Sequence, residues 1–336
     1  MEMTSARAVL LRRHGPYSLP PMWRLRGACA LLVFSVCMSQ GKLLPEEQIA
    51  SRHLGGSRSV RVYLPPSYDR APKRRYPVLY LHDGQNVFSS SGPHCCFGWG
   101  SWELDRTADR LAAEGRMQEI IMVAVDNTRS RYKEYRGRIH LEGAKAGKAF
   151  RGDTNILDNA KFDAYANFLI KELKLKIDRE YRTLKTPANT GVMGSSLGGI
   201  CSVSLGWEYP KVFGRAASLS GSFHIEKRNF LEQVLQRDSP ARKSIRFYLD
   251  SGTIDFTGDD DDRRYTDAVA DELRRLGWKD GRNLQRYTET RPYTDQELEK
   301  TGLPFDKWHE AQRSQHNEFY WRMRVWRALV FLFPAK

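Results

Sequence analysis

The chain has 336 residues, enough for one large or two small α/β domains, and its 40% hydrophobic content excludes wholesale disorder. Its formal net charge of +14 would suggest a nucleic-acid partner, but the excess is unevenly placed. Residues 1–75 hold 13 Lys or Arg against 4 Asp or Glu, whereas the remainder holds 41 against 36. Because the remainder has no basic helix or stripe of interleaved aromatic residues, we expect no nucleic-acid partner.

The N-terminal segment resembles a signal peptide. Arg24 and Arg26 precede an apolar run at 28–39, which is too short to cross a bilayer of roughly 30 Å as a helix. We expect residues 1–41 to be a cleaved leader, with Met22 as an alternative start, and a buried N-terminal helix as the competing interpretation. The mature chain is then periplasmic or secreted and has no membrane span, whereas an uncleaved chain is cytoplasmic.

Three cysteines remain after the leader: Cys95, Cys96 and Cys201. They allow at most one disulfide, so the adjacent pair forms either a local loop disulfide or two unpaired thiols. No CxxC or His-x-His pattern accompanies them, and we expect no metal site.

From residue 60 onward, short β-branched and apolar runs alternate with amphipathic stretches. This alternation predicts one doubly wound α/β domain over residues 45–334, with a mostly parallel sheet flanked by helices. In chain order, strands are expected at 59–68, 76–84, 119–127, 215–221, 244–255 and 283–290, and helices at 161–181, 265–278 and 317–333.

The stretch "GVMGSSLGGI" contains Gly194-Ser195-Ser196-Leu197-Gly198, a G-x-S-x-G pattern. A short buried strand precedes it, and a helix that Pro210 ends follows it. A serine at such a strand-to-helix turn is held in a strained backbone conformation, and glycines two positions before and after it leave the space that the turn needs. Ser196 is therefore the candidate nucleophile, and Gly194 and Gly198 are the elbow glycines.

A nucleophilic serine needs a histidine base, which on this fold follows it in the chain. His224 precedes every candidate acid, and His309 lies in a polar stretch without a clear element boundary. His316 lies after the last strand and directly before the closing helix, where such a base belongs. We predict His316 as the base, with His309 as the alternative.

The acid is expected in the loop after the strand 244–255. Asp250 still belongs to the strand end, whereas Asp255 follows a Ser-Gly-Thr turn from which a side chain can reach over the sheet edge. We predict Asp255 as the acid. The run Asp259–Asp262 lacks the ligand spacing of a calcium loop and is interpreted as a solvated turn balanced by Arg263 and Arg264.

The oxyanion hole needs two backbone N–H groups. Leu197 follows the nucleophile and supplies one, and Gln85 in "HDGQNVF" is the expected second donor. His82 and Asp83 are adjacent at a strand end and point in opposite directions, so structural roles are expected for them rather than a catalytic pair.

Four residues are candidates for a substrate pocket, although tryptophans more often pack in a core. They are Asp83, Trp99, Trp102 and Trp308.

A series of blocks, in order over residues 58–334, resembles the putative esterase family, the esterase D and enterochelin-esterase-like branch of the α/β-hydrolases. The blocks include "YPVLYLHDGQNVF", "VAVDNTRSRYKEYRG", "TGVMGSSLGGICSVSLGWEYPKVFGRAASLSGSF" and "HNEFYWRMRVWRALVFLF". The resemblance implies a serine hydrolase that cleaves carboxylic esters without a cofactor. It also implies Ser196 as nucleophile, Asp255 in "GTID" as acid and His316 in "HNE" as base.

Residues 291–315 depart from the family pattern, because related sequences pass quickly from the last strand to a glycine-rich turn before "HNE". This insertion is either a lid over the site or a surface excursion.

The sequence thus predicts an exported serine esterase acting on a small-molecule ester. The alternatives are an acyltransferase with the same triad and a catalytically idle hydrolase fold used for binding.

Overall fold

The computed structural model describes residues 40–140, 159–238 and 244–335 of the chain. These residues belong to one compact unit that begins at Met38. The predicted leader, apart from its last two residues, lies outside the described residues.

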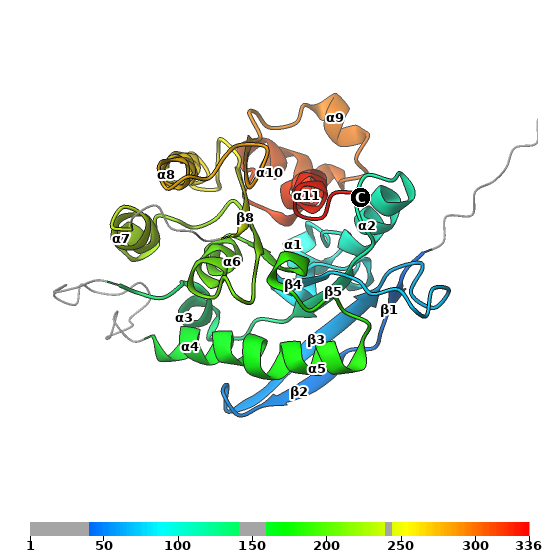
Figure 1. Cartoon of the computed structure of the whole chain (residues 1–336). Helices are drawn as coiled ribbons and strands as arrows, with labels where there is room; N and C mark the ends of the chain where they lie inside the picture. Colours follow the sequence, from blue (N-terminus) through cyan, green and yellow to red (C-terminus); the bar gives the residue numbers. More distant parts are fainter. Residues whose placement is uncertain (1–39, 141–158, 239–243, 336) are drawn as a thin grey trace, which may run out of the picture. The chain divides into compact units, whose positions relative to one another are not determined.

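A mixed sheet organises this unit (Figure 1). Its strands are β1 (Lys42–Leu43), β2 (Glu47–Ser51), β3 (Gly56–Leu64), β4 (Val78–His82), β5 (Ile121–Val125), β6 (Thr190–Ser195), β7 (Arg215–Leu219), β8 (Arg246–Ser251) and β9 (Leu284–Thr288). Their order is β1-β3-β5-β4-β6-β7-β8-β9, and β2 also pairs with β3. β1 and β2 run antiparallel to β3, and β3 runs antiparallel to β5, whereas all pairs from β5 to β9 are parallel.

The unit contains a series of helices, several of which cover the two faces of the sheet. They are α1 (Cys95–Gly98), α2 (Leu104–Ala113), α3 (Arg131–Tyr135), α4 (Ala160–Asn167), α5 (Lys174–Glu180), α6 (Leu197–Glu208), α7 (Ile225–Asn229), α8 (Arg263–Arg275), α9 (Asp295–Glu299), α10 (Trp308–Arg313) and α11 (Glu318–Leu332). A π-helical segment, Phe168–Leu173, joins α4 to α5.

The central strands are buried on both faces, which explains their almost continuous apolar sequences. In β4, Leu79 and Leu81 point into the core shared with α2 and α11. Val78 and Tyr80 point into the larger core under α4, α5, α6 and α8. Figure 1 shows these two helical layers on opposite sides of the sheet.

The parallel strands fix the position of the candidate site, because their carboxyl ends share one edge of the sheet. Gln85 follows β4 and Ser196 follows β6, and these strands are neighbours. The β8–α8 loop and the segment before α11 bring the remaining predicted groups to the same edge. The α/β-hydrolase fold predicted from the sequence is confirmed, and the β2–β3 hairpin is an addition that the prediction missed.

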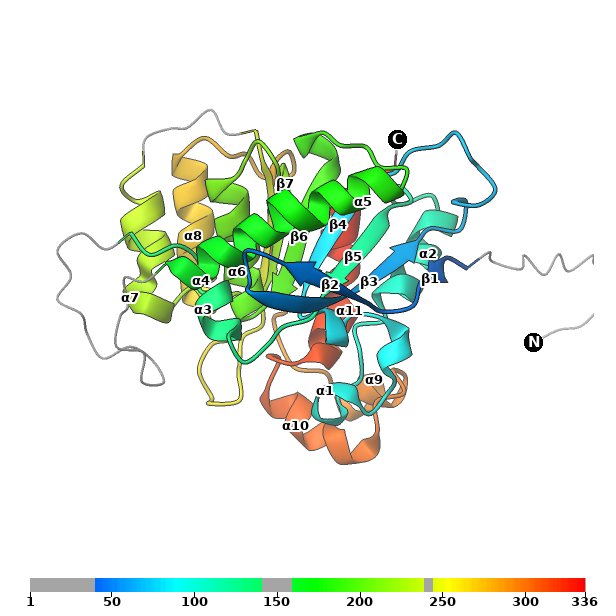
Figure 2. The same ribbon diagram turned by 90° about the horizontal axis from the view of Figure 1, so that it is seen from below.

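The insertion 291–315 is folded. α9 begins with a capping box, in which Thr294 and Glu297 satisfy each other's backbone N–H groups. Leu298, Leu303 and Ala311 form a small core against the first turn of α11. Figure 2 shows α9 and α10 gathered with α1 at one end of the unit, and Lys307 of the insertion lies over the Trp99 ring.

Candidate active site

Ser196 is the single residue between the end of β6 and the start of α6. Its backbone angles are φ 54° and ψ −122°, a conformation that residues with a side chain rarely adopt. Its N–H donates to the carbonyl of Leu219 at 2.9 Å, and its carbonyl accepts from the N–H of Ser222 at 3.1 Å. Neighbouring backbone therefore maintains the strained turn predicted for a nucleophile elbow.

The two elbow glycines are required by space. A Cβ atom added to Gly194 would lie 2.7 Å from the carbonyl of Gly198. A Cβ atom added to Gly198 would lie 3.2 Å from the Cβ of His82 and from Oδ2 of Asp83. The strand and the helix can therefore approach each other this closely only without side chains at these positions.

His316 lies beside Ser196. Its Nε2 is 3.0 Å from Ser196 Oγ, and its Nδ1 is 2.6 Å from Asp261 Oδ1. Two aromatic rings pack against the imidazole in T-shaped arrangements. The centroid of the Trp321 ring lies 5.2 Å from that of His316, and the centroid of the Phe256 ring lies 6.0 Å from it. The structure thus brings Ser196 and His316 together as predicted, with Asp261 completing the series.

The other two histidines considered from the sequence do not contact Ser196. His309 is exposed on α10. His224 Nδ1 lies 2.6 Å from Asp262 Oδ2, and this hydrogen bond raises the pKa of His224 above its ordinary value.

The prediction that Asp255 orients the histidine is wrong. Its carboxylate accepts hydrogen bonds from the N–H and hydroxyl of Thr257, at 2.8 and 2.6 Å, and from the N–H of Asp259 at 3.1 Å. Asp255 therefore closes its own turn. The chain then passes through left-handed conformations at Asp261 and Asp262, with φ of 54° and 55°, which direct Asp261 back under the sheet edge.

The interpretation of Asp259–Asp262 as a solvated turn is correspondingly wrong for Asp261. Arg264 does pair with Asp259 at the surface, at 2.6 Å, but the side chain of Asp261 is 0% exposed. A run of four identical residues gives no sequence signal to separate the buried member from its neighbours.

Several buried donors surround the second oxygen of Asp261. Ser220 Oγ donates to Oδ2 at 2.6 Å, and the N–H of Gly252 also donates to it. Arg324, fully buried on α11, has Nη2 3.8 Å from Oδ2 and Nε 3.0 Å from Asp250 Oδ1. Burial alone would raise the pKa of Asp261, but the hydrogen bond and charge of His316, together with Arg324, hold it below its ordinary value. Ser220 and Arg324 are site residues that were not predicted from the sequence.

The predicted oxyanion donors lie at the same sheet edge. Within the described part of the chain, neither the N–H of Gln85 nor that of Leu197 has a hydrogen-bond partner. The Gln85 side chain is fixed, because its Oε1 accepts from the N–H of Asn127 at 3.2 Å. The backbone carbonyl of Gln85 accepts a hydrogen bond from Ser91 Oγ at 2.7 Å. Both N–H groups are thus unengaged by the described residues at the carboxyl-end edge of the sheet, where the oxyanion donors are expected.

Asp83 has a structural role rather than a pocket role. Its carboxylate is nearly fully buried and forms a two-point ion pair with Arg131, with Nε 2.7 Å from Oδ1 and Nη2 2.8 Å from Oδ2. His82 is also buried, with Nδ1 2.8 Å from the Tyr165 hydroxyl, and burial lowers the pKa of His82 to about 4. The structural roles predicted for His82 and Asp83 fit these contacts, whereas Asp83 as a pocket residue does not.

A cavity of about 550 Å³ opens beside His316. Its wall consists of the turn around Phe256, helix α10 of the insertion, and the region of α1. The lining residues include Phe97, Trp99, Asp255, Phe256, His309 and Arg313. The insertion 291–315 therefore contributes one wall of this cavity. Phe97 and Phe256 are strongly exposed, at 92% and 76%.

Of the three candidate pocket tryptophans, only Trp99 lines this cavity. Trp102 is buried in the core, with its ring 6.0 Å from that of Trp321. Trp308 packs on Phe305 and donates from Nε1 to the carbonyl of Leu303 at 2.9 Å. The pocket prediction is wrong for Trp102 and Trp308, which form core contacts instead.

The three cysteines in the described part of the chain are thiols. The Sγ atoms of Cys95 and Cys96 lie 3.4 Å apart without a disulfide, and Cys201 is buried. Among the described residues no cluster of His, Cys, Asp or Glu could hold a metal ion. None of the helices in these ranges combines the length and apolar character needed to cross a membrane.

Comparisons with solved structures show the same fold. A ferulic acid esterase superposes with a TM-score of 0.57 at 18% identity, covering 88% of this chain and 98% of that chain. The enterobactin esterase FES from Shigella flexneri, solved with enterobactin, superposes with a TM-score of 0.58 at 17% identity, over 86% of this chain and 58% of that chain.

Proteins with similar sequences are also found in bacteria. The protein YjcH of Bacillus subtilis is 26% identical over 63% of this chain and 78% of its own length. An endo-1,4-beta-xylanase/feruloyl esterase of Xylanibacter ruminicola is 27% identical over 52% of this chain, which spans only 21% of that relative.

The family described as "Putative esterase" matches residues 51–331. Because this match covers well over half of the chain, the chain belongs to the putative esterase family and is a carboxylic ester hydrolase.

Proposed function

We propose that this chain hydrolyses carboxylic esters through an acyl-enzyme formed on Ser196, with His316 as base and Asp261 as the orienting acid. The observation that supports this most directly is the continuous hydrogen-bonded series: Ser196 Oγ is 3.0 Å from His316 Nε2, and His316 Nδ1 is 2.6 Å from Asp261 Oδ1.

In the first half-reaction, His316 Nε2 takes the hydroxyl proton as Ser196 Oγ bonds to the ester carbonyl carbon. The N–H groups of Leu197 and Gln85 donate to the resulting oxyanion. The carboxylate of Asp261 accepts from the Nδ1–H and stabilises the imidazolium. When the tetrahedral intermediate collapses, the carbon–oxygen bond to the alcohol breaks, and the alcohol leaves with the proton from Nε2.

In the second half-reaction, water gives a proton to His316 Nε2 and attacks the acyl carbon. Collapse of this intermediate releases the carboxylic acid, and the proton returns to Ser196 Oγ. All steps use groups of this chain and water, without a cofactor.

The cavity beside His316 supports an ester with an aromatic acyl group. Phe97, Trp99 and Phe256 present ring surface at its wall, and aromatic rings stack favourably on such side chains. The structural neighbours include a ferulic acid esterase and an enterobactin esterase. We therefore expect kcat/KM for methyl ferulate to exceed that for methyl butanoate; equal values would argue against aromatic selection.

Hydrolysis itself is tested with p-nitrophenyl acetate. We expect wild-type turnover that is abolished in Ser196→Ala, whereas an unaffected Ser196→Ala protein would remove this serine from the mechanism.

We further propose that the chain is exported. The support is the basic pair Arg24 and Arg26 before the apolar run 28–39. Mass spectrometry of the expressed protein should show a new N-terminus near Lys42, and an intact Met1 or Met22 would contradict export by a cleaved leader.

A further inference from the structure

A second cavity lies at the opposite edge of the sheet, where the parallel strands begin. Its volume is about 460 Å³, and its wall is formed by the first residues of β7 and β8 and by the loops that lead into β6 and β9. The polar and charged side chains that line it are Arg215, Ser244, Arg246, Lys279, Arg282 and Asn283. Ser196 follows the carboxyl end of β6, so this cavity is separate from the candidate active site.

The cavity is strongly basic. Four of its lining residues are cationic, Arg215, Arg246, Lys279 and Arg282, and no Asp or Glu lines it. Across residues 40–140, 159–238 and 244–335, none of these four forms an ion pair. The acidic residue next in sequence, Asp280, instead pairs with Arg274 at 2.8 Å.

Two of the cations lie on neighbouring strands at the same level of the sheet. Arg215 and Arg246 are register partners in the β7–β8 pair, and like charges in such positions repel each other. Burial and then the charge of Arg246 lower the pKa of Arg215 to about 10, and burial lowers the pKa of Arg246. The folded protein thus maintains an uncompensated positive pair.

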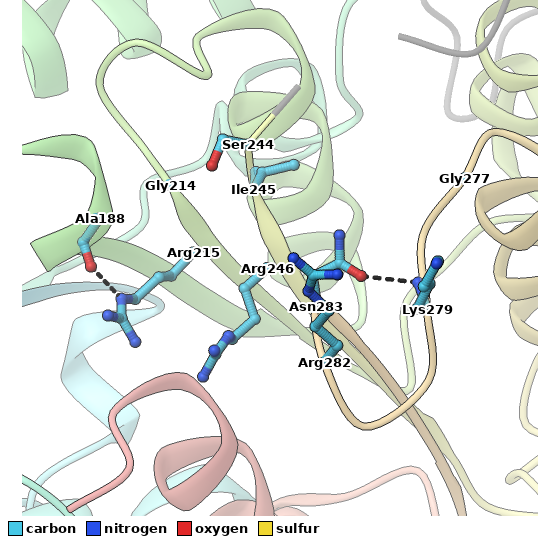
Figure 3. A pocket seen from close by; sticks show the side chains of 10 residues that line it. All are labelled: Ala188, Gly214, Arg215, Ser244, Ile245, Arg246, Gly277, Lys279, Arg282 and Asn283. Atoms are coloured by element: carbon cyan, nitrogen blue, oxygen red, sulfur yellow. Dashed lines mark hydrogen bonds between the residues drawn. The ribbon is translucent and has the colours of Figure 1, made fainter. Parts of the chain in front are cut away.

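Both guanidinium groups are held in place, and Figure 3 shows the hydrogen bond between Arg215 and Ala188. Arg215 donates from Nε to the carbonyl of Ala188 and lies over the Phe333 ring at 4.9 Å. Arg246 donates from Nη1 to the carbonyl of Phe331 at 2.7 Å and lies over its ring at 5.1 Å. Arg215 Nη1 is buried and has no hydrogen-bond partner in the described part of the chain. Ordered cations with unused N–H groups are typical of an anion site.

We propose that this basic cavity binds a multivalent oxyanion of the phosphate type. Arg215 and Arg246 supply N–H donors in fixed forks, and Lys279 and Arg282 supply further positive charge from the opposite loop. Ser244 and Asn283 add neutral polar groups to the wall. A phosphate group would neutralise the repulsion between the two register partners, so binding and stability are coupled.

Inorganic pyrophosphate is the probe. We expect isothermal titration calorimetry at fixed ionic strength to show one site, and thermal unfolding to shift upward beyond the effect of sodium chloride of equal ionic strength. Arg246→Gln should weaken the affinity at least tenfold. The double variant Lys279→Gln/Arg282→Gln changes only an exposed loop, and it should also weaken the affinity at least tenfold. It provides the same test if Arg246→Gln does not fold.

Arg52→Gln is the matched control, because it removes the same charge from the exposed β2–β3 turn. It should leave pyrophosphate affinity within twofold, and Ser196→Ala should bind as wild type does. The proposal is overturned if pyrophosphate has no more effect than chloride, or if the basic-cavity variants bind as tightly as Arg52→Gln.

A phosphate group can be free or carried by a lipid. Sedimentation with phosphatidylcholine vesicles, with and without phosphatidylinositol phosphate, separates these sources. Binding to the vesicles with phosphatidylinositol phosphate that is lost in Arg246→Gln identifies a lipid headgroup as the ligand. Pyrophosphate binding without vesicle binding identifies a free anion. Either result, obtained with a protein that binds pyrophosphate, supports the oxyanion site, and the vesicle assay decides only between the two sources.

Discussion

Asp261 Oδ1 lies 2.6 Å from His316 Nδ1, although the two residues are 55 positions apart in the chain. Asp255, only six positions before Asp261, instead bonds the N–H and hydroxyl of Thr257 within its own turn. The acid of the site is therefore selected by the path of the β8–α8 loop rather than by proximity to the strand end.

Replacement of Asp261 separates the two carboxylates. Asp261→Asn should lower kcat by about 10³–10⁴, because the amide stabilises the wrong histidine tautomer and cannot balance the imidazolium. Asp255→Asn, the matched control, should change kcat by less than about tenfold, since Asp255 closes a turn in the cavity wall and forms no hydrogen bond with His316. Steady-state hydrolysis of p-nitrophenyl acetate measures both, and a larger loss in Asp255→Asn would reverse the assignment.

Gly194 should tolerate no side chain. In Gly194→Ala the new Cβ would lie 2.7 Å from the Gly198 carbonyl, which is backbone and can move only by distorting the elbow. We expect a loss of about 1–3 kcal/mol in the free energy of unfolding and a reduced kcat. Gly56→Ala is the control, because a Cβ there meets nothing within 4 Å. Urea denaturation of both variants decides the point; equal stabilities would refute it.

Glu318 should make stability depend on pH. Burial raises the pKa of this carboxyl to about 7, and the charge of Asp83 acts in the same direction. The N–H of Glu318 itself and the charges of His316 and Arg131 lower this pKa, but they do not outweigh burial. In the unfolded chain it ionises near 4.5, so between pH 4.5 and 7 the folded state binds more protons than the unfolded state. This group therefore makes the folded state less stable as pH rises through that window.

Glu318→Gln removes this effect. Relative to wild type, the variant should gain about 2 kcal/mol in the free energy of unfolding between pH 4.5 and 7.5, a value discounted for partial exposure of the carboxyl. Denaturant unfolding at several pH values measures the gain. The exposed Glu299→Gln on α9 controls for the removal of one charge. A stability difference independent of pH would contradict the assignment.

Phe256 should contribute to substrate binding. Phe256→Ala removes an exposed ring from the cavity wall beside His316 and should raise KM for methyl ferulate about tenfold, or ~1.4 kcal/mol. Because Trp321 and Asp261 still hold the imidazole of His316, kcat for p-nitrophenyl acetate should change less than KM for methyl ferulate. Phe305→Ala is the control, since Phe305 is 80% exposed but lies outside this cavity wall. An equal effect of both variants would argue against a specific aromatic contact.

The features that could be predicted from sequence are those set by local pattern. The Ser196 turn combines a buried strand, small flanking residues and a following helix within a few residues, so its strained φ of 54° was expected. His316 was found because it directly precedes a long apolar helix. Both inferences use residues that are neighbours in the chain.

The missed features depend on tertiary geometry. Left-handed residues at Asp261 and Asp262 determine which carboxylate is buried, and neither is a glycine that would have indicated the turn. Arg324 is a charged residue on an expected helix, and its burial becomes evident only when Asp250 and Asp261 lie beside it. The basic cavity depends on the register that sets Arg215 beside Arg246.

The most direct test of the catalytic proposal is covalent labelling with a fluorophosphonate, followed by mass spectrometric location of the adduct. We expect wild type to be labelled on Ser196, and both Ser196→Ala and His316→Ala to remain unlabelled while retaining native circular dichroism. Folded wild type that is not labelled and hydrolyses no ester, or a label on another residue, would contradict the assignment of Ser196 as an activated nucleophile.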